Sequence, residues 1–320
     1  MGLSGIAYFI ARRVLTLVVM LFVISVLIFS LLYLAPGNAV DILLGARPRT
    51  PETVKLLTEQ YHLDEPFLAQ YWIWLKGALH FDFGESIQTT LPVAHQIKER
   101  LPTSLLLAAY AFVLEMSFGL LFGILAARKR RTGVDRGIVA ISVVGVSTPA
   151  FVSGVLMLFA FAVQLRWFPA FGAGEGFMDE VWHLTLPAIS LAIVGTAYIV
   201  KHTRAAVISV LDQDYVTFAR ARGLSSVSVM LGYILRNSLI SVLGLSAMIL
   251  SFLVVGAVIV ETTFSISGIG QLLVQAATSQ DLPMIQGVGI LVAAIVMIAN
   301  LAADLAYLAF DPRIRLRSAK

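Results

Sequence analysis

Glu115 is the first candidate for chemistry, because it is the one charged residue inside the otherwise uncharged run Leu105–Ala127. A carboxylate at the centre of a membrane span costs about 2.5–3.5 kcal/mol on insertion scales, so its presence needs a reason. It could face a solute path or carry a proton, or it could be a protonated or paired structural group. We favour the structural interpretation, because no basic residue lies at a similar depth to form a proton relay with it.

Three further polar or helix-breaking residues occur in or beside apolar runs. Asn300 and Asp304 are four residues apart, which places them on one face of a helix. They could line a path, but a hydrogen-bonding stripe between helices is the better interpretation. Pro149 interrupts the run Ile138–Leu165 and predicts a kink there. Kinks are frequent in transporters and also in membrane proteins that transport nothing.

Several familiar chemistries lack their residues. The chain has no cysteine, which excludes disulfides, thiol catalysis and iron–sulfur ligation. It has no G-x-x-x-x-G-K-[ST] motif, so we expect no ATP bound by a P-loop. The five histidines lie outside or at the ends of the apolar runs, which favours interfacial hydrogen bonding over metal ligation. We therefore expect no catalytic residue, no metal and no cofactor bound by this chain.

The composition indicates an all-α integral membrane protein. Of 320 residues, 58% are hydrophobic and only 13% are charged, about half the charged share of a soluble protein. A membrane-spanning helix needs about 20 apolar residues. Six runs meet this need, the second interrupted only by Glu115. They are Val14–Leu34, Leu105–Ala127, Ile138–Leu165, Leu184–Val200, Ser238–Val260 and Leu282–Ala303.

The charges between these runs predict the orientation. With the N-terminus inside, the inner segments hold sixteen of the 23 basic residues, and thirteen of the 19 acidic residues lie outside. This bias places both termini in the cytoplasm and the protein in the cell membrane. The net charge of +4 could suggest nucleic acid, but the basic residues cluster at span ends, so topology explains them and no nucleic acid is expected.

The predicted organisation has four parts. An N-terminal segment with the first span covers 1–35, and an extracytoplasmic loop covers 36–100. A core with five spans covers 101–310, and a basic cytoplasmic tail covers 311–320. Within the loop, Thr53–Tyr61 and Pro66–Leu79 have helical character. The loop is too small to form a domain with a sizeable core of its own.

The most distinctive segment is the polar island Asp212–Asn237, which separates two apolar runs. Its apolar residues recur at helical spacing, Gly223 should end that helix, and Ser225 or Ser226 can cap a second one. A short helix, a glycine and a second helix on the cytoplasmic side suit the docking of a soluble partner. The residues alone leave an ordinary amphipathic connector on the membrane surface equally open.

Short motifs spread over nearly the whole chain carry a family resemblance. They are Arg12–Arg13, Leu34–Asn38 (LAPGN), Phe81–Ser86 (FDFGES), Leu101–Leu107 (LPTSLLL), Leu186–Ser190 (LPAIS), Asp214–Leu224 (DYVTFARARGL), Leu235–Asn237 (LRN), Glu261–Gly270 (ETTFSISGIG) and Asp311–Arg315 (DPRIR). In this order and spacing, the chain resembles the permease subunits of dipeptide/oligopeptide-type ABC importers, a branch that includes nickel-uptake permeases.

The resemblance implies a fold, partners and a docking site. The fold would be a six-helix type I ABC importer transmembrane domain with an extracytoplasmic loop after the first helix. The partners would be a second homologous permease, two cytoplasmic ATPases that use ATP and Mg, and an extracytoplasmic solute-binding protein. The docking loop would be 201–237. Its contact residues would be Tyr215, Phe218, Ala219, Arg220, Arg222, Gly223 and Leu224.

The sequence departs from the family pattern in places that leave the solute open. The general docking motif E-A-A-x-x-x-G is kept only at Ala219 and Gly223, while Thr217 and Phe218 differ. Small peptides are the expected cargo, with nickel chelates or another small solute as the alternative. Two rival functions remain open on the residues alone. One is a proton-coupled secondary transporter that uses Glu115, and the other is a membrane scaffold that transports nothing.

Overall fold

The computed structural model describes residues 3–34, 38–45, 48–172 and 174–310, and it is helical throughout apart from turns and one isolated bridge. The predicted tail 311–320 and residues 35–37 of the LAPGN motif lie outside the described residues. The elements are α1 (Leu3–Leu34), α2 (Ala39–Leu44), α3 (Pro51–Gln60), α4 (Phe67–Leu79), α5 (Val93–Arg128), α6 (Gly133–Ser147), α7 (Ala150–Met157), the π-helical η1 (Leu158–Gln164), α8 (Phe177–Leu211), α9 (Asp214–Ala221), α10 (Ser226–Val229), the π-helical η2 (Met230–Leu235), α11 (Arg236–Thr263), α12 (Ile269–Thr278) and α13 (Leu282–Phe310).

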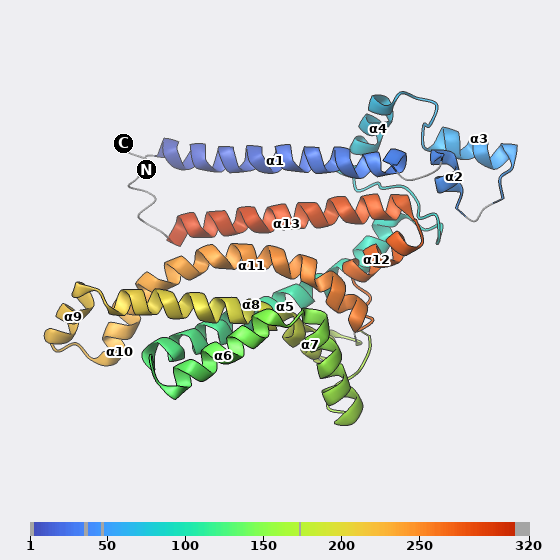
Figure 1. Cartoon of the computed structure of the whole chain (residues 1–320). Helices are drawn as coiled ribbons and strands as arrows, with labels where there is room; N and C mark the ends of the chain where they lie inside the picture. Colours follow the sequence, from blue (N-terminus) through green and yellow to red (C-terminus); the bar gives the residue numbers. More distant parts are fainter. Residues whose placement is uncertain (1–2, 35–37, 46–47, 173, 311–320) are drawn as a thin grey trace.

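The long helices form an elongated bundle. Helices α1, α13, α11 and α8 run side by side along its length, and α1 packs on α13, which packs on α11 (Figure 1). The polar island, with α9 and α10, occupies one end, here called the island end. Helices α2 to α4 occupy the other, called the loop end. The start of α1 and the end of α13 both lie at the island end.

The six predicted spans fall on helical segments. Within the described residues, four helices are long and apolar enough to cross a membrane, namely α1, α5, α8 and α13. A fifth span results if the bent pair formed by α6 and α7 with η1 counts as one. The remaining predicted span, Ser238–Val260, lies in α11, where Met248–Thr263 is an apolar stretch. The prediction of an all-α integral membrane fold is confirmed.

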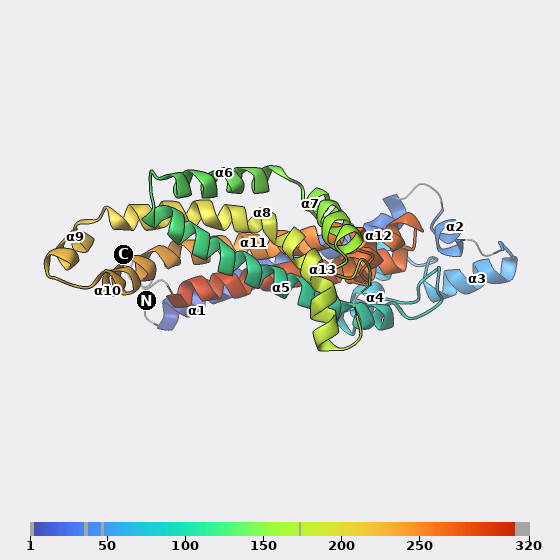
Figure 2. The ribbon, with the colours of Figure 1, turned by 90° about the horizontal axis from the view of Figure 1, so that it is seen from below.

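The third predicted span is broken rather than kinked. Between α6 and α7 the chain bends by 102° at Thr148–Pro149. Proline has no N–H to donate to the preceding turn, and its ring clashes with the carbonyl four residues before it. As a result α6 runs alongside α8 while α7 turns across the bundle (Figure 2). The predicted run Ile138–Leu165 is therefore divided between two helical arms, Gly133–Ser147 and Ala150–Gln164, each shorter than the about 20 residues of a span.

Two outer motifs tie the loop end together through buried carboxylates. Glu261, fully buried at the end of α11, accepts hydrogen bonds from Ser104 Oγ (2.7 Å) and from the backbone N–H groups of Gly270 (2.7 Å) and Gln271 (3.1 Å). It thereby caps the free N–H groups at the start of α12. Asp281, before α13, accepts from Ser86 Oγ of the FDFGES motif. The expected loop helices are confirmed as α3 and α4.

The closest helix packing joins α5 to α8, and glycine makes it possible. A Cβ on Gly119 would lie 2.5 Å from the side chain of Ile199, and one on Gly123 would lie 2.6 Å from Thr203 Cβ. Real Cβ atoms do not approach side chains this closely, so only hydrogen fits at these positions. Small residues that let helix backbones approach are the usual basis of packing in membranes.

We expect Gly119→Ala to destabilise the protein by about 1–3 kcal/mol, the cost of overpacking a close contact. Gly137→Ala is the matched control, because a Cβ there meets no atom within 4 Å. The control should be neutral or slightly stabilising, since alanine favours the helix by up to about 1 kcal/mol over glycine. Thermal melting of the purified chain in detergent, followed by circular dichroism, measures both. A Gly119→Ala variant that melts no lower than the control would contradict the packing argument.

Candidate functional site

The polar island folds as a sharp turn between two short helices. Helix α9 ends at Ala221 with Arg222 as its C-cap residue, and Gly223 follows with φ +78°, a conformation that residues with a side chain adopt at a cost. The Gly223 N–H donates to Arg220 O (2.9 Å), which closes the turn. Ser225 caps α10 by accepting from the Ser228 N–H (3.2 Å). The expected helix end at Gly223 and the Ser225 cap are confirmed.

One face of the island is anchored to the bundle. Val216 and Ala219 of α9 are buried against Ala127, near the end of α5, and Val207 of α8. Val229 of α10 belongs to the same cluster. A movement of this turn must therefore carry the ends of α5 and α8 with it. Ala219 was expected to contact a partner, but it is only 4% exposed, because α9 turns this face to its own chain.

The opposite face of the island is apolar, cationic and uncovered within the described chain. Phe218 is 68% exposed at the tip of the bundle, and Tyr215 and Leu224 are exposed beside it. Arg220 and Arg222 are exposed on the same turn. The predicted contact residues other than Ala219 are thus all exposed at the island end. Arg220 also lines a hollow of about 610 Å³ at the junction with the end of α5.

Two ion pairs that sequence reasoning missed hold the nearby α5–α6 turn. Arg130 NH1 donates to both carboxylate oxygens of Asp212, at 2.8 and 3.0 Å. Asp135 accepts from Arg204 Nε (2.6 Å), Arg204 NH2 (2.8 Å) and the Arg131 N–H (2.9 Å). The Asp135 side chain is 5% exposed, so this second pair is a buried bidentate clamp between α6 and α8. The available signal was a single acidic residue within the basic stretch 128–136.

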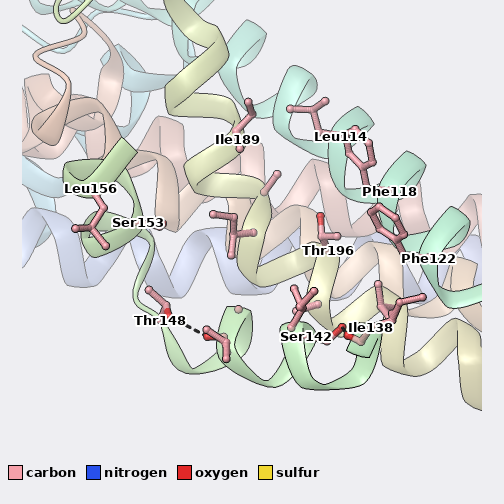
Figure 3. A pocket seen from close by; sticks show the side chains of 17 residues that line it. Leu114, Phe118, Phe122, Ile138, Ser142, Thr148, Ser153, Leu156, Ile189 and Thr196 are labelled. Atoms are coloured by element: carbon pink, nitrogen blue, oxygen red, sulfur yellow. Dashed lines mark hydrogen bonds between the residues drawn. The ribbon is translucent and has the colours of Figure 1, made fainter. Parts of the chain in front are cut away.

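The second candidate surface is an apolar hollow of about 530 Å³ bordered by α5, α6, α7 and α8 (Figure 3). Leu114, Phe118 and Phe122 of α5 form one wall. None of the residues that line the hollow is charged. Two of its hydroxyls, Ser142 and Thr148, already donate to backbone carbonyls of their own helix, at 2.8 and 2.9 Å. The hollow is therefore predominantly apolar, and Thr196 adds a further hydroxyl to its lining.

The hollow is also incomplete. Among its lining residues, Ile141 is 74% exposed, Val144 is 65% exposed and Leu156 is 61% exposed. These side chains belong to the arms on either side of the Pro149 break. An apolar wall of this kind, open on one side, suits contact with lipid or with a second subunit. Pro149 thus shapes the hollow through the bend, although it is not itself among the lining residues.

The other sequence candidates lie away from the hollow. Glu115 is 2% exposed and faces Gly195 across the α5–α8 contact, where a Cβ would collide with its carboxyl group. Asn300 Oδ1 accepts from Ser251 Oγ of α11 (2.8 Å). Asp304 lies 3.2 Å from Arg13 Nε of α1. These polar side chains make contacts between helices, and none of them lines the hollow.

The chain is similar to known transport proteins over nearly its whole length. Residues 119–316 match the family model described as binding-protein-dependent transport system inner membrane component, and residues 6–108 match the N-terminal model of such membrane components. A putative peptide transport system permease protein from Brucella abortus (strain 2308) is 36% identical over 96% of this chain and 98% of its own length.

Further relatives and a solved structure agree with this match. The di/tripeptide transport system permease protein DppB of Pseudomonas aeruginosa is 35% identical over 96% of this chain and 98% of its own length. The glutathione transport system permease protein GsiC of Escherichia coli K12 is 34% identical over 97% and 99%. The fold is also similar to a chain in the inward-facing MetNI methionine ABC transporter, with a TM-score of 0.52, 17% identity and coverage of 68% of this chain and 96% of that one.

We expect Asp135→Asn to destabilise the protein by about 1–3 kcal/mol, because it removes the carboxylate that accepts two hydrogen bonds from the Arg204 guanidinium, whose side chain is 31% exposed. Asp212→Asn is the matched control. It removes the partner of Arg130 from a pair in which both side chains are about half exposed, so its cost should stay below about 1 kcal/mol. Thermal melting of both variants in detergent measures the difference. Equal shifts would show that the Asp135–Arg204 clamp does not hold α6 to α8.

Proposed function

Because this chain belongs to the family of inner membrane components of binding-protein-dependent transport systems, we propose that it is the permease subunit of an ATP-driven importer of small peptides. The observation that carries the proposal is the polar island, an anchored turn with an exposed apolar and cationic face. The printed activities of the peptide, di/tripeptide and glutathione permeases support a peptide cargo. Importers of other small solutes remain the alternative class.

We assign ATP hydrolysis to two separate cytoplasmic ATPases, since this sequence has no phosphate-binding loop. ATP and Mg would be bound there and not by this chain. A second, homologous permease would close the open side of the hollow, and an extracytoplasmic binding protein would deliver the cargo. The island end would face the cytoplasm, which agrees with the basic residues of the inner segments and with the position of the α1 start and the α13 end.

The anchoring of the island suggests how ATPase closure could reach the path. Val216 and Ala219 join the island to the ends of α5 and α8, and these two helices also form walls of the hollow. The Asp135–Arg204 clamp ties α6, a third wall, to α8. A displacement of the island would thus tilt three walls together. ATP shifts such an equilibrium only if the ATPases contact the island differently in the two states.

A proton-coupled mechanism is less well supported by the geometry. Glu115 is its candidate carboxyl group, but this residue is buried in the α5–α8 contact instead of facing the hollow. A coupling carboxylate must exchange its proton with both sides during the cycle. The tight glycine packing around Glu115 offers no such access without separating the two helices, which disfavours the proton-coupled alternative.

We expect Phe218→Asp to lower ATPase co-purification and ATP-dependent uptake at least tenfold, because it places a charge in the proposed apolar contact. The chain should still insert, since Phe218 packs on nothing that holds the bundle together. Leu56→Asp is the matched control: Leu56 is a similarly exposed residue, 58% against 68%, on α3 at the loop end. The control should keep ATPase binding. Normal ATPase binding by Phe218→Asp would refute the docking assignment.

Substitutions at Gly223 separate backbone conformation from contact. A Cβ at this position meets no atom within 4 Å, so only the positive φ opposes a side chain. Asparagine tolerates this conformation far better than a β-branched residue does. We expect Gly223→Val to reduce ATP-dependent uptake severalfold more than Gly223→Asn, measured in vesicles that contain equal amounts of the complex. Equal losses would mean that the turn geometry is not what the site requires.

A further inference from the structure

Helix α4 lies crosswise to the bundle at the loop end, and one side of it is sealed against α1 (Figure 1). The sealed side is aromatic. Phe29 of α1 packs against the rings of Phe67, Tyr71 and Trp74 of α4, with ring centres 5.4 to 5.6 Å apart. Tyr71 also shares a hydrogen bond with Ser25 of α1 (2.8 Å). The depth of α4 along α1 is thereby fixed at the last turns of that helix.

A second side of α4 faces the rest of the loop. Gln70, Ile73 and Gly77 line a hollow of about 420 Å³ together with Asp82 and Glu85 of the FDFGES segment. A Cβ on Gly77 would lie 2.9 Å from the Asp82 carbonyl oxygen, so α4 and this segment are in close contact. This side therefore belongs to the folded loop.

The third side is an apolar stripe without a partner within the described chain. Leu68, Trp72, Leu75 and Leu79 are spaced by four, three and four residues, which places them in one line along the helix. Leu68 is 76% exposed, Trp72 is 54% exposed and Leu79 is 72% exposed. Lys76 borders the stripe, with its Nζ 5.4 Å from the Trp72 ring centre, and α4 carries no acidic residue.

We propose that this stripe is buried in the interfacial layer of the bilayer, so that α4 is a membrane-surface helix that holds the loop at a fixed depth. Three observations lead to the lipid surface as the occupant. The helix against which α4 packs, α1, is long and apolar enough to cross a membrane, and its apolar side chains Phe22, Leu27 and Leu31 are exposed. It lies apart from the α4 side that faces the folded loop. Its tryptophan, leucines and single lysine are the composition that favours the headgroup boundary.

A position in the interfacial layer would give α4 a mechanical role in the extracytoplasmic loop. An interfacial helix resists movement along the membrane normal, because displacement either way exposes apolar area to water or drives Lys76 into hydrocarbon. The loop that contains α4, including the FDFGES segment bound by Asp281, would then keep its depth relative to the membrane surface while the bundle moves. The proposal goes beyond the docking assignment, and its test needs neither an ATPase nor a cargo.

The absence of cysteine allows a direct test in the full-length chain. Single cysteines at Leu68, Trp72 and Leu79 are labelled with a nitroxide in nanodiscs of phosphatidylethanolamine and phosphatidylglycerol. Leu56→Cys on α3 is the exposed control. Collision with oxygen, which concentrates in lipid, and with a water-soluble nickel chelate is measured by power saturation. We expect the oxygen-to-nickel ratio on the stripe to exceed the control at least threefold.

Each other outcome overturns the proposal. A ratio equal to that at Leu56 means that the stripe faces water. Low accessibility to both reagents means that protein covers it, either a second copy of this chain or another subunit. A ratio that equals the control in the chain alone, with protection only after a soluble binding protein is added, identifies a receptor contact instead of a lipid surface. Three label positions ensure that one poorly inserting variant does not decide the result.

Discussion

The close contact of α5 with α8 is the interaction on which the rest of the structure depends. Between helices surrounded by lipid there is no hydrophobic driving force, so close van der Waals packing must supply the stability. Gly119 and Gly123 of α5 allow this approach, and Gly195 of α8 accommodates the Glu115 carboxyl group at the same interface. The same pair of helices carries the anchors of the polar island at one end and walls of the apolar hollow further along. Both candidate surfaces therefore share one rigid support.

At both ends of the bundle, a buried carboxylate accepts hydrogen bonds from backbone N–H groups where the chain changes direction. At the loop end Glu261 satisfies the first N–H groups of α12, and glycines at 268 and 270 leave room for its carboxyl group. At the island end Asp135 captures the Arg131 N–H while it binds Arg204. Arg131 has a φ of +65°, an uncommon conformation for a residue with a side chain, and this hydrogen bond helps to hold it. Both ends of the bundle thus close their turns with a buried carboxylate.

Much of this architecture could be predicted from the sequence, because it depends on local patterns. Apolar length predicts the spans, and Gly223 and Ser225 predict the turn of the island from backbone preference and capping alone. Pro149 predicts a kink but neither the full break nor its angle, which depends on how α7 packs against α8 and α11. Helical spacing placed Ala219 beside Phe218 without showing that α9 turns Ala219 inward. The Asp135–Arg204 pair joins residues 69 positions apart, so no local pattern reveals it.

The apolar lining of the hollow bears on which protein of the importer discriminates between solutes. A path must bind its solute strongly enough to admit it and weakly enough to release it. A wall without charges, whose Ser142, Thr148 and Ser153 hydroxyls already donate to backbone carbonyls, offers a peptide few polar partners beyond the Thr196 hydroxyl. Strong discrimination between solutes requires paired polar groups, because a mismatched solute then leaves a buried group unsatisfied. In the proposed importer that discrimination must lie outside this hollow, in the protein that delivers the cargo. The permease then needs only an apolar path that its helices can line in both the inward-open and the outward-open arrangement. The glycine contacts and the Asp135–Arg204 clamp hold the helices together while the bundle changes from one arrangement to the other.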